Sequence, residues 1–512
     1  MKAGNQLPNV RPQSDYLYER RGPWPQPQPA HPFGFAPGVV HVPKDEVRRW
    51  KWRIGLRYFL TTLTFWPVAA LYAWKHRSLE PVSDEEFEKI LTHSSLSKFI
   101  SNELNEREKY PDNEKLKIFK SFLDAEPNER FYVADYSLMT HLKTYPGIYA
   151  AATMSLFKGP LVNGQRKVVA IYLSDSKKMF TPADGNAWEL AKYFVLQGGA
   201  NRIASSAHAN LHFPYDSMNA ISKSALPKDS VLLRLLLPHF DLTLELNYAV
   251  LNTPTSPVLN KQYLPFTAFP APADGLAGLF LYGYNGMEGN PSYPHYKFHA
   301  VPGPKNYPSD YGTFLMSYYF TTLEFVNGVV GLIPKEEYVD IRVWTDYINT
   351  WVPEFPDHPE FFTDDDQLIE KEVEFSGGKK TVYVLAETVA NIIWDLSVGH
   401  AADHYDYSKQ NINQVPLRLR VPPPDSKDVP PLDRKKMIHW IDLFKHHFER
   451  KMFFAPRNVT LLMDTQYNFF KPHEQPLREL NKQFLENLKK TEQNLTVYNY
   501  IPLNQISRSI QY

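Results

Sequence analysis

Apolar residues recur at helical spacing through two long segments of the chain. One opens at Trp188 and continues past Gly198 toward His212, and the other runs over residues 384–405. A helical period sustained over this length predicts α-helices, and the scarcity of charged residues predicts that both helices are buried. The same pattern predicts a further helix over residues 476–491.

Other segments carry shorter signals. Ser83 followed by Glu86 is typical of a helix start, because the Ser side chain caps the helix and the Glu completes a capping box. Residues 168–173, Val-Val-Ala-Ile-Tyr-Leu, predict a short buried strand. Residues 252–310 are rich in Pro, Gly and Tyr and predict loops, and three prolines at 422–424 end the preceding element. The chain is therefore predicted to be mainly α with small β elements.

The first 80 residues differ from the rest. Residues 1–45 are dense in proline and predict a disordered or polyproline-type tail. Residues 46–80 combine a basic cluster with an uncharged apolar run from Tyr58 to Trp74. Residues 48–77 could form a membrane-surface segment, with interfacial aromatic side chains and basic residues on anionic lipid. They could equally form a buried helix of the body, whereas a bilayer span is disfavoured because the run reaches only the minimum length.

Composition excludes several classes of function. The 512 residues are 43% hydrophobic and 14% aromatic, which suffices for a large core and, by length alone, for two to four domains. Lys and Arg number 56, as do Asp and Glu, so a general electrostatic case for nucleic acid is missing. The absence of Cys excludes disulfides, thiolate ligands and iron–sulfur clusters. No secretory signal peptide is seen, so a cytoplasmic or membrane-associated location is expected.

Two histidine pairs carry the candidate chemistry: His208 with His212, and His400 with His404. Each pair has i, i+4 spacing, which places both rings on one face of a helix. Two such helices packed face to face would direct four imidazoles at one point, and neutral imidazole binds iron, zinc, copper and nickel. A third pair, His295 and His299, lies between prolines and is interpreted as structural. The adjacent His446 and His447 are expected to be solvated.

The residues around both pairs resemble the lipoxygenase family. Residues 391–404, Asn-Ile-Ile-Trp-Asp-Leu-Ser-Val-Gly-His-Ala-Ala-Asp-His, are similar to the family's central helix. Residues 188–192, Trp-Glu-Leu-Ala-Lys, resemble the Trp-x-Leu-Ala-Lys block that precedes the first ligand. Residues 235–239, Leu-Leu-Leu-Pro-His, resemble the run that follows the second ligand, and Arg-Val-Pro-Pro-Pro at 420–424 resembles the stop after the central helix. Together these blocks are far more specific than the histidines alone.

The resemblance implies a lipoxygenase-like helical catalytic domain over residues 81–512, with long central helices and no N-terminal β-barrel domain. It implies one non-haem iron or manganese ion, with a polyunsaturated fatty acid and dioxygen as substrates. It implies a dioxygenase that inserts dioxygen into a 1,4-pentadiene unit to give a hydroperoxide. A monomer is expected.

The resemblance also assigns site residues. His208, His212, His400 and His404 would bind the metal, with His404 as the variable ligand, and the terminal carboxylate of Tyr512 would be a fifth ligand. Val250 falls at the position that governs oxygenation stereochemistry. No side chain is assigned a catalytic role beyond a water or hydroxide on the metal.

Several positions depart from the family pattern. Three residues separate His208 from His212, as in fungal manganese lipoxygenases, whereas most members have four and need a π-bulge. Asp241 replaces an Arg, Asp406-Tyr407 replaces Gly-Gln, and Tyr512 replaces Ile. Two alternatives to dioxygenation therefore stay open. The first is a lipoxygenase-fold enzyme with diverged chemistry, such as hydroperoxide rearrangement or oxidation of another polyene, and the second is an inactive lipid-binding homologue.

Overall fold

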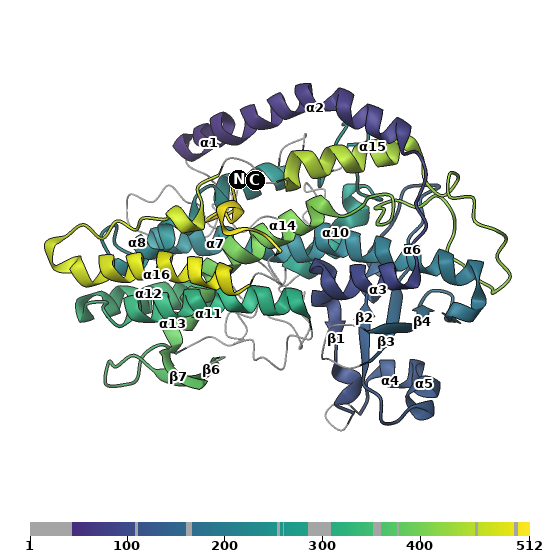
Figure 1. Ribbon diagram of the computed structural model, residues 1–512. Coiled ribbons are helices and arrows are strands. Elements are labelled where there is room, and N and C mark those ends of the chain that lie inside the picture. The colour runs from purple at the N-terminus through teal and green to yellow at the C-terminus, as the bar shows by residue number, and fades with distance from the viewer. Residues whose placement is uncertain are drawn as a thin grey trace.

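Helices make up most of the structure, a computed structural model that describes residues 44–107, 111–159, 166–252, 256–259, 261–284, 309–351, 360–375, 378–455, 459–495 and 500–511. The helices are α1 (Lys44–Trp50), α2 (Leu56–Lys75), α3 (Asp84–His93), α4 (Glu114–Ile118), α5 (Lys120–Ala125), α6 (Asn186–Asn201), α7 (His208–Ala225), α8 (Val231–Leu236), α9 (Thr243–Asn252), α10 (Ala273–Tyr284), α11 (Asp310–Val330), α12 (Tyr338–Trp351), α13 (Val384–Trp394), α14 (His400–Lys409), α15 (Trp440–Glu449) and α16 (Gln475–Asn494). The expectation of a mainly α fold is confirmed (Figure 1).

Both long apolar helices predicted from the sequence are present, and each contains a π-helical turn. The π turn Arg202–Ala207 joins α6 to α7, and the π turn Asp395–Gly399 joins α13 to α14. Every residue of both π turns is buried, as the apolar pattern predicted. The capping box at Ser83 is also confirmed, because the Ser83 side chain accepts a hydrogen bond from the backbone N–H of Glu86.

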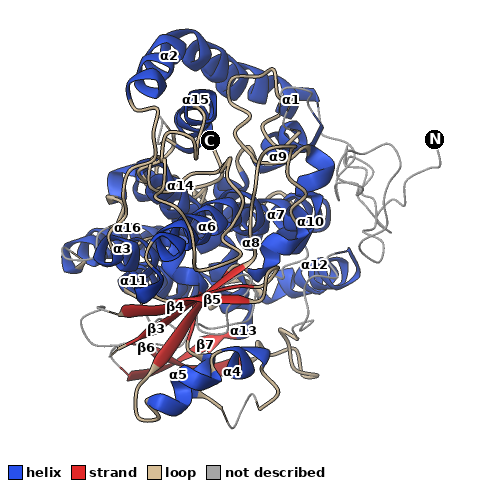
Figure 2. Ribbon diagram, turned by 90° about the vertical axis from the view of Figure 1, so that its right-hand side faces the viewer, coloured by secondary structure: helices blue, strands red, loops and turns tan. Residues whose placement is uncertain are grey.

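A five-stranded antiparallel sheet lies at one end of the molecule, below the helices in Figure 2. Its strands pair in chain order: β1 (Ile100–Ser101), β2 (Phe131–Asp135), β3 (Thr153–Lys158), β4 (Lys167–Leu173) and β5 (Lys178–Phe180). The predicted strand at 168–173 is β4. Val168 and Ile171 pack with Trp188 and Phe194 of α6 in one core, whereas Ala170 faces a smaller core beneath α4 and α5. A separate hairpin is formed by β6 (Glu370–Phe375) and β7 (Gly378–Tyr383).

Helices α11, α13 and α16 all come from the second half of the chain and contribute to the largest hydrophobic core, in which α11 packs against both α13 and α16. α16 confirms the helix predicted over 476–491. The prediction of loops over 252–310 is wrong for α10, whose mainly apolar sequence ADGLAGLFLYGY forms a helix against the π turn that precedes His208. Gly275 lets α10 approach a second segment closely, because a Cβ there would lie 2.2 Å from the carbonyl oxygen of Lys143.

The basic and apolar segment forms a surface helix rather than a core helix. α1, a π turn (Lys51–Gly55) and α2 follow one another across one side of the molecule, above α15 in Figure 1. α2 is buried only at Thr61, Ala69 and Ala73, which belong to the face turned toward the body. The predicted tail at 1–45 lies almost wholly outside the described residues.

Candidate metal centre

Four imidazoles meet between the two long helices. The Nε2 atoms of His212 and His400 lie 2.9 Å apart, and those of His208 and His404 lie 3.0 Å apart. The ligand-capable nitrogens of all four rings lie within 4.8 Å of one another. The structure therefore brings together the two histidine pairs that the sequence singled out.

The local helix geometry explains this convergence. His208 and His212 are both in α7, so an ordinary α-turn places their rings on one face, as the short spacing predicted. His400 and His404 are related in the same way in α14. Each pair begins directly after a π turn, which rotates the following helix relative to the preceding one and so sets the direction of the ligand face.

The imidazoles are held in the neutral, metal-binding form. Burial lowers the pKa of His208, His400 and His404 well below the usual value, and the neighbouring imidazoles lower it further. Neutral rings so close together offer lone pairs at one point, where a proton would be disfavoured and a metal cation favoured.

The donor set fits a transition-metal ion. Two nitrogen ligands at right angles and about 2.1 Å from one ion lie about 3.0 Å apart, which matches the 2.9 and 3.0 Å separations. The four-histidine group is thus able to hold a metal. Imidazole nitrogen suits iron, manganese, zinc and copper in different geometries, so the histidines alone do not select the ion.

An apolar cavity of about 60 Å³ opens beside the histidines. His208, His212 and His404 form part of its wall, and Val250 is also a wall residue. The rest of the wall is mainly apolar and aromatic, including Tyr58, Phe269, Phe280, Phe453 and Phe454. The candidate metal centre therefore faces a mainly apolar pocket, and the position expected to influence stereochemistry lies in its lining.

Comparisons with known proteins address the architecture around this centre. No family model matches the chain, and no curated protein matches its sequence. Among solved structures, a coral 8R-lipoxygenase superposes with a TM-score of 0.66 at 13% identity, covering 97% of this chain and 79% of that one. The structure of a manganese lipoxygenase superposes with a TM-score of 0.64 at 14% identity over 91% of each chain. The chain has the fold of a lipoxygenase catalytic domain. A fungal lipoxygenase from Fusarium graminearum agrees, with a TM-score of 0.58 at 14% identity over 84% of this chain and 80% of that one.

Within the lipoxygenase fold, buried acids fix the ligand helices. The Tyr215 hydroxyl of α7 donates a 2.5 Å hydrogen bond to Asp395 in the π turn before His400, joining the two ligand helices directly. Asp403 accepts from the Tyr311 hydroxyl at 2.9 Å and pairs with Lys98. Asp406 accepts from the backbone N–H and the hydroxyl of Ser95, at 2.9 and 2.5 Å. Asp406, one of the residues that depart from the family pattern, thus anchors α14 to the segment that precedes β1.

A second cluster of buried polar side chains, formed by Tyr407, His446 and Glu449, was not predicted from the sequence. The Tyr407 hydroxyl lies 3.2 Å from Nε2 of His446 and donates to Glu449 at 3.5 Å, and Glu449 is part of the cavity wall. The expectation that His446 and His447 are solvated is wrong for His446, which is 4% exposed because α2 and α14 cover α15. The spacing of Phe444, Phe448 and the histidines on a helix with a strong apolar face was the available signal.

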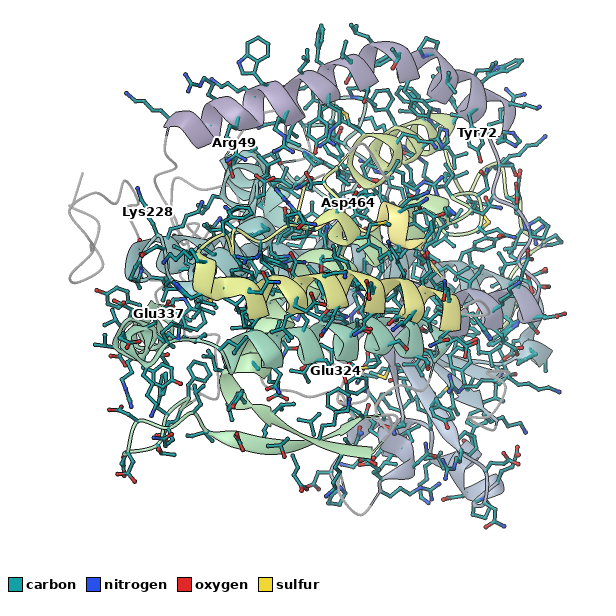
Figure 3. The ribbon with its side chains drawn as sticks, turned by 60° about the vertical axis from the view of Figure 1, so that its left-hand side comes forward. Arg49, Tyr72, Lys228, Glu324, Glu337 and Asp464 are labelled. Atoms are coloured by element: carbon teal, nitrogen blue, oxygen red, sulfur yellow. The ribbon has the colours of Figure 1, made fainter. Side chains whose placement is uncertain are left out.

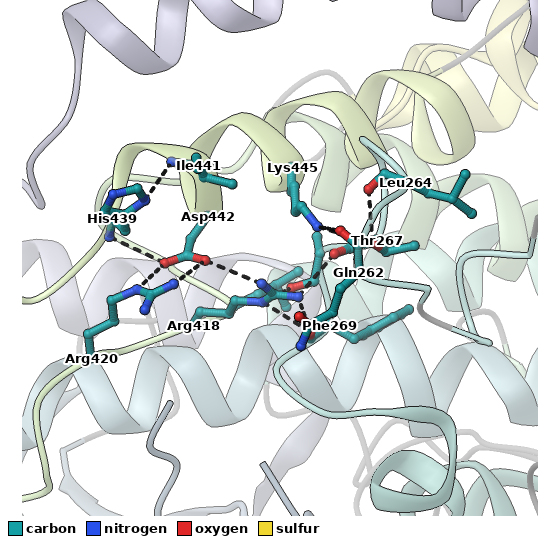
Figure 4. A network of polar contacts seen from close by, with 12 residues as sticks. Gln262, Leu264, Thr267, Phe269, Arg418, Arg420, His439, Ile441, Asp442 and Lys445 are labelled. Atoms are coloured by element: carbon teal, nitrogen blue, oxygen red, sulfur yellow. Dashed lines mark hydrogen bonds and ion pairs between the residues drawn. The ribbon is translucent and has the colours of Figure 1, made fainter. Parts of the chain in front are cut away.

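A polar network holds α15 and the cavity wall in place (Figure 4). Asp442 accepts from Arg420 at 2.6 and 3.0 Å and from Arg418 at 3.2 Å. Arg418 also donates to the carbonyl oxygens of Thr267 and Phe269 at 3.0 and 2.6 Å. Because Phe269 lines the cavity, this network fixes one wall of the metal pocket against the start of α15.

The C-terminal segment, residues 500–511, enters the core. Ile501, Ile506 and Ile510 are fully buried, and Gln511 is 1% exposed. His239 anchors the segment, because Nδ1 lies 2.7 Å from the carbonyl oxygen of Arg508 and Nε2 lies 2.9 Å from the Tyr467 hydroxyl. Tyr512 lies outside the described residues, as do His295 and His299.

Asp241, which replaces the family Arg, connects both ends of the described chain. Its carboxylate accepts from Arg49 at 2.5 Å, from Arg53 at 3.2 Å and from the Gln511 side chain at 3.1 Å. Its carbonyl oxygen accepts from the Ser509 hydroxyl at 2.6 Å. Asp241 therefore forms polar contacts with α1, with the π turn that follows α1 and with the C-terminal segment.

Proposed function

We propose that the protein is a non-haem metal dioxygenase that inserts dioxygen into a polyunsaturated fatty acid and forms a hydroperoxide. The observation that carries the proposal is the four-histidine cluster opening on an apolar cavity inside a lipoxygenase fold. A solved lipoxygenase with this fold, at 13% identity and a TM-score of 0.64, was determined in complex with arachidonate. A long polyunsaturated chain is thus the ligand that the proposal assigns to the cavity.

The ion proposed for the centre is iron or manganese. When bound, such an ion supplies the one-electron chemistry that removes a hydrogen atom from a doubly allylic carbon. His208, His212 and His400 would hold it, with His404 as the adjustable ligand. The neutral imidazoles leave the net charge of the ion uncompensated, so an anionic ligand would stabilise its higher oxidation state. The carboxylate of Tyr512 remains the predicted source of that charge.

Residues of the cavity wall would orient the substrate and dioxygen and limit the access of water to the metal. Phe269, Phe280 and Phe454 form an aromatic wall beside the histidines. Such a wall would disfavour water there, so a carbon radical formed on the substrate would meet dioxygen rather than solvent. Val250 on the same wall restricts where dioxygen can approach, and we propose it as a residue that determines the stereochemistry of the product.

Metal analysis and oxygen uptake test the proposal. Purified protein loaded with iron or manganese should bind about one ion per chain and consume dioxygen with linoleic or arachidonic acid, forming a conjugated diene. His400→Ala should lose metal and oxygen uptake together, whereas His473→Ala, on an exposed histidine, should change neither. Full metal occupancy in His400→Ala would refute the assignment.

The same assay separates the two alternatives. Consumption of an added fatty-acid hydroperoxide without oxygen uptake would replace the proposal with a diverged rearrangement chemistry on the same centre. A protein that binds fatty acid but no metal under any loading condition would instead be an inactive lipid-binding homologue.

A further inference from the structure

The outer face of α2 exposes large apolar side chains along its whole length. Leu63 is 59% exposed, Leu71 64% and Trp74 63%, and Trp52 in the preceding π turn is 69% exposed. Leu56, Phe59, Leu60, Trp66 and Val68 are also exposed. A patch this large and continuous is unusual on a soluble surface and indicates a docking site.

The inner face of the same helix is attached to the body. Phe65 contacts Phe448 of α15 in a tilted arrangement, and Tyr72 stacks on His447 at 4.2 Å between ring centres. Trp66, which is 48% exposed, lies at the edge between the two faces and contacts Phe448 edge-on. The Tyr72 hydroxyl donates to Asn413 at 3.2 Å, and Arg57 donates to the carbonyl oxygen of Gln511 at 2.6 Å. Figure 3 shows Arg49 and Tyr72 near opposite ends of this helical segment, with other side chains projecting outward from it.

The charges around the patch are mainly basic, although Asp45 and Glu46 lie in the first turn of α1. No Asp or Glu occurs between Val47 and Leu79. Arg48, Lys51 and Arg53 are exposed at one end of the helical segment, and Lys75 and Arg77 are exposed at the other. Apolar and Trp side chains flanked by cations are the combination by which a helix lies in the interface of an anionic bilayer.

We propose that α1 and α2 dock the protein on the surface of anionic membranes. By length and composition alone the helical segment over residues 47–75 could cross a bilayer. A crossing would break the polar contacts of Arg57 and Tyr72 and expose the apolar surface of α15, whereas interfacial docking preserves both. A second copy of the chain is a poorer occupant, because basic residues outnumber acidic ones over residues 44–77 and a two-fold contact through this face would bring both excesses of positive charge together.

Docking would place the bilayer beside the metal cavity. Tyr58 belongs to α2, and its side chain is part of the cavity wall together with Phe453, on which it packs edge-on at 5.0 Å. On the basis of the proposed function, a fatty chain leaving the bilayer under α2 would thus reach the histidines without crossing bulk water.

Vesicle co-sedimentation of the full-length protein tests the docking surface. Binding to phosphatidylcholine vesicles containing phosphatidylglycerol should exceed binding to pure phosphatidylcholine vesicles, and should fall as salt rises. The double variant Leu63→Ser with Leu71→Ser should bind at least tenfold more weakly. The matched control, Leu332→Ser with Phe470→Ser, removes exposed apolar side chains elsewhere and should bind like the wild type. Unchanged thermal unfolding of both variants would show that the body is intact.

The basic residues are tested in the same assay. Arg48→Gln with Lys51→Gln should weaken binding to anionic vesicles by roughly fivefold for each charge removed, whereas Lys379→Gln with Lys482→Gln should not. Equal binding by all variants would overturn the proposal, as would a dimer in light scattering that the Leu63 and Leu71 changes dissociate. Vesicle-bound protein that resists alkaline carbonate extraction would show a span instead. Vesicle binding needs no turnover, so failure of docking is distinguishable from failure of the proposed reaction.

Discussion

The imidazoles of the metal centre differ in how tightly the fold fixes them. His400 is fully buried, and the π turn before it is joined to α7 through Asp395. His404 is in contact with the π turn Arg450–Phe454, through an interaction with the Phe453 backbone and a ring contact with Phe454 at 4.8 Å. His404 therefore contacts the π turn that forms part of the cavity wall, whereas His400 is not part of that wall.

Replacing His404 with Asn should leave metal bound and retain part of the oxygen uptake, because three imidazoles and an amide oxygen still face the ion. Metal content by mass spectrometry and oxygen consumption measure the two effects, with His400→Ala as the comparison. Complete loss of metal in His404→Asn would show that all four imidazoles are required equally.

Glu449 predicts a pH dependence of stability. Burial raises the pKa of its carboxyl to about 8, although Arg450 and the Tyr407 hydrogen bond oppose the shift. Since the folded pKa is above the ordinary 4.5, the stabilisation is complete below pH 4.5 and is lost as pH rises through about 8. Glu449→Gln should remove this slope of up to about 1.4 kcal/mol per pH unit.

Urea unfolding of wild type and Glu449→Gln between pH 5 and pH 9 checks this expectation. The difference in unfolding free energy between the two proteins should grow in favour of the variant as pH rises. Glu372→Gln, at a carboxyl that is 66% exposed, is the control and should run parallel to the wild type. A constant difference for Glu449→Gln would mean that this carboxyl is already ionised in the folded protein.

Among the elements, the two ligand helices were predictable because their apolar period is long and their charges few. The i, i+4 histidines followed from the same helices, so the metal centre was found with them. The short strands β1, β2, β3 and β5 carry too few residues for a clear period, and β2 and β3 are buried along almost their whole length. Helix α10 was missed because Pro, Gly and Tyr in this region indicated loops, whereas burial of Leu276, Leu279 and Phe280 in the core outweighs the low helix propensity of its glycines. Contacts between distant side chains, such as Tyr215 with Asp395, leave no local pattern.

Tyr215→Phe tests the connection between the ligand helices. Loss of the hydroxyl removes a donor from the buried carboxyl of Asp395, whose pKa burial already raises to about 7. The variant should lose about 1–3 kcal/mol of stability in urea unfolding. Tyr318→Phe is the control, since the Tyr318 hydroxyl is buried with no hydrogen-bond partner among the described residues. Equal effects of both changes would contradict a specific role for the Tyr215 contact.

On the scale of the whole molecule, Asp241 joins segments that lie far apart in the sequence. Its side chain is 7% exposed and pairs with Arg49, Arg53 and Arg508, so one carboxylate offsets several cations. The surface helix, the C-terminal segment and the turn after α8 are thereby held together.

Asp241→Asn should loosen this junction. Neutralising the carboxylate leaves the arginines repelling one another, and about 1–3 kcal/mol of stability should be lost. Limited proteolysis should then cut within the α1 region sooner than in the wild type. Asp366→Asn, which breaks an exposed pair with Arg342, should change stability by less than about 1 kcal/mol. Equal protease resistance of Asp241→Asn and wild type would show that α1 is held by other contacts.

The buried position of Gln511 makes the terminus testable. Adding one Gly after Tyr512 would shift the terminal carboxylate, and hydrogen abstraction should be abolished if that carboxylate binds the metal. Oxygen uptake and metal content measure this, with Tyr512→Ile as the comparison that should be tolerated. Unchanged oxygen uptake in the extended protein would leave the metal to the histidines alone.

The burial of residues 500–511 also constrains when the protein can mature. These residues are synthesised after every other described residue. Nevertheless, Ile501, Ile506 and Ile510 fill part of the core, and the His239 ring contacts the carbonyl oxygen of Arg508. Until residues 500–511 have been synthesised, a growing chain carries both histidine pairs but lacks the side chains that fill this part of the core. Such a chain exposes apolar surface to which chaperones can bind. Completion of the core around the candidate metal centre is thus expected to follow the synthesis of this segment.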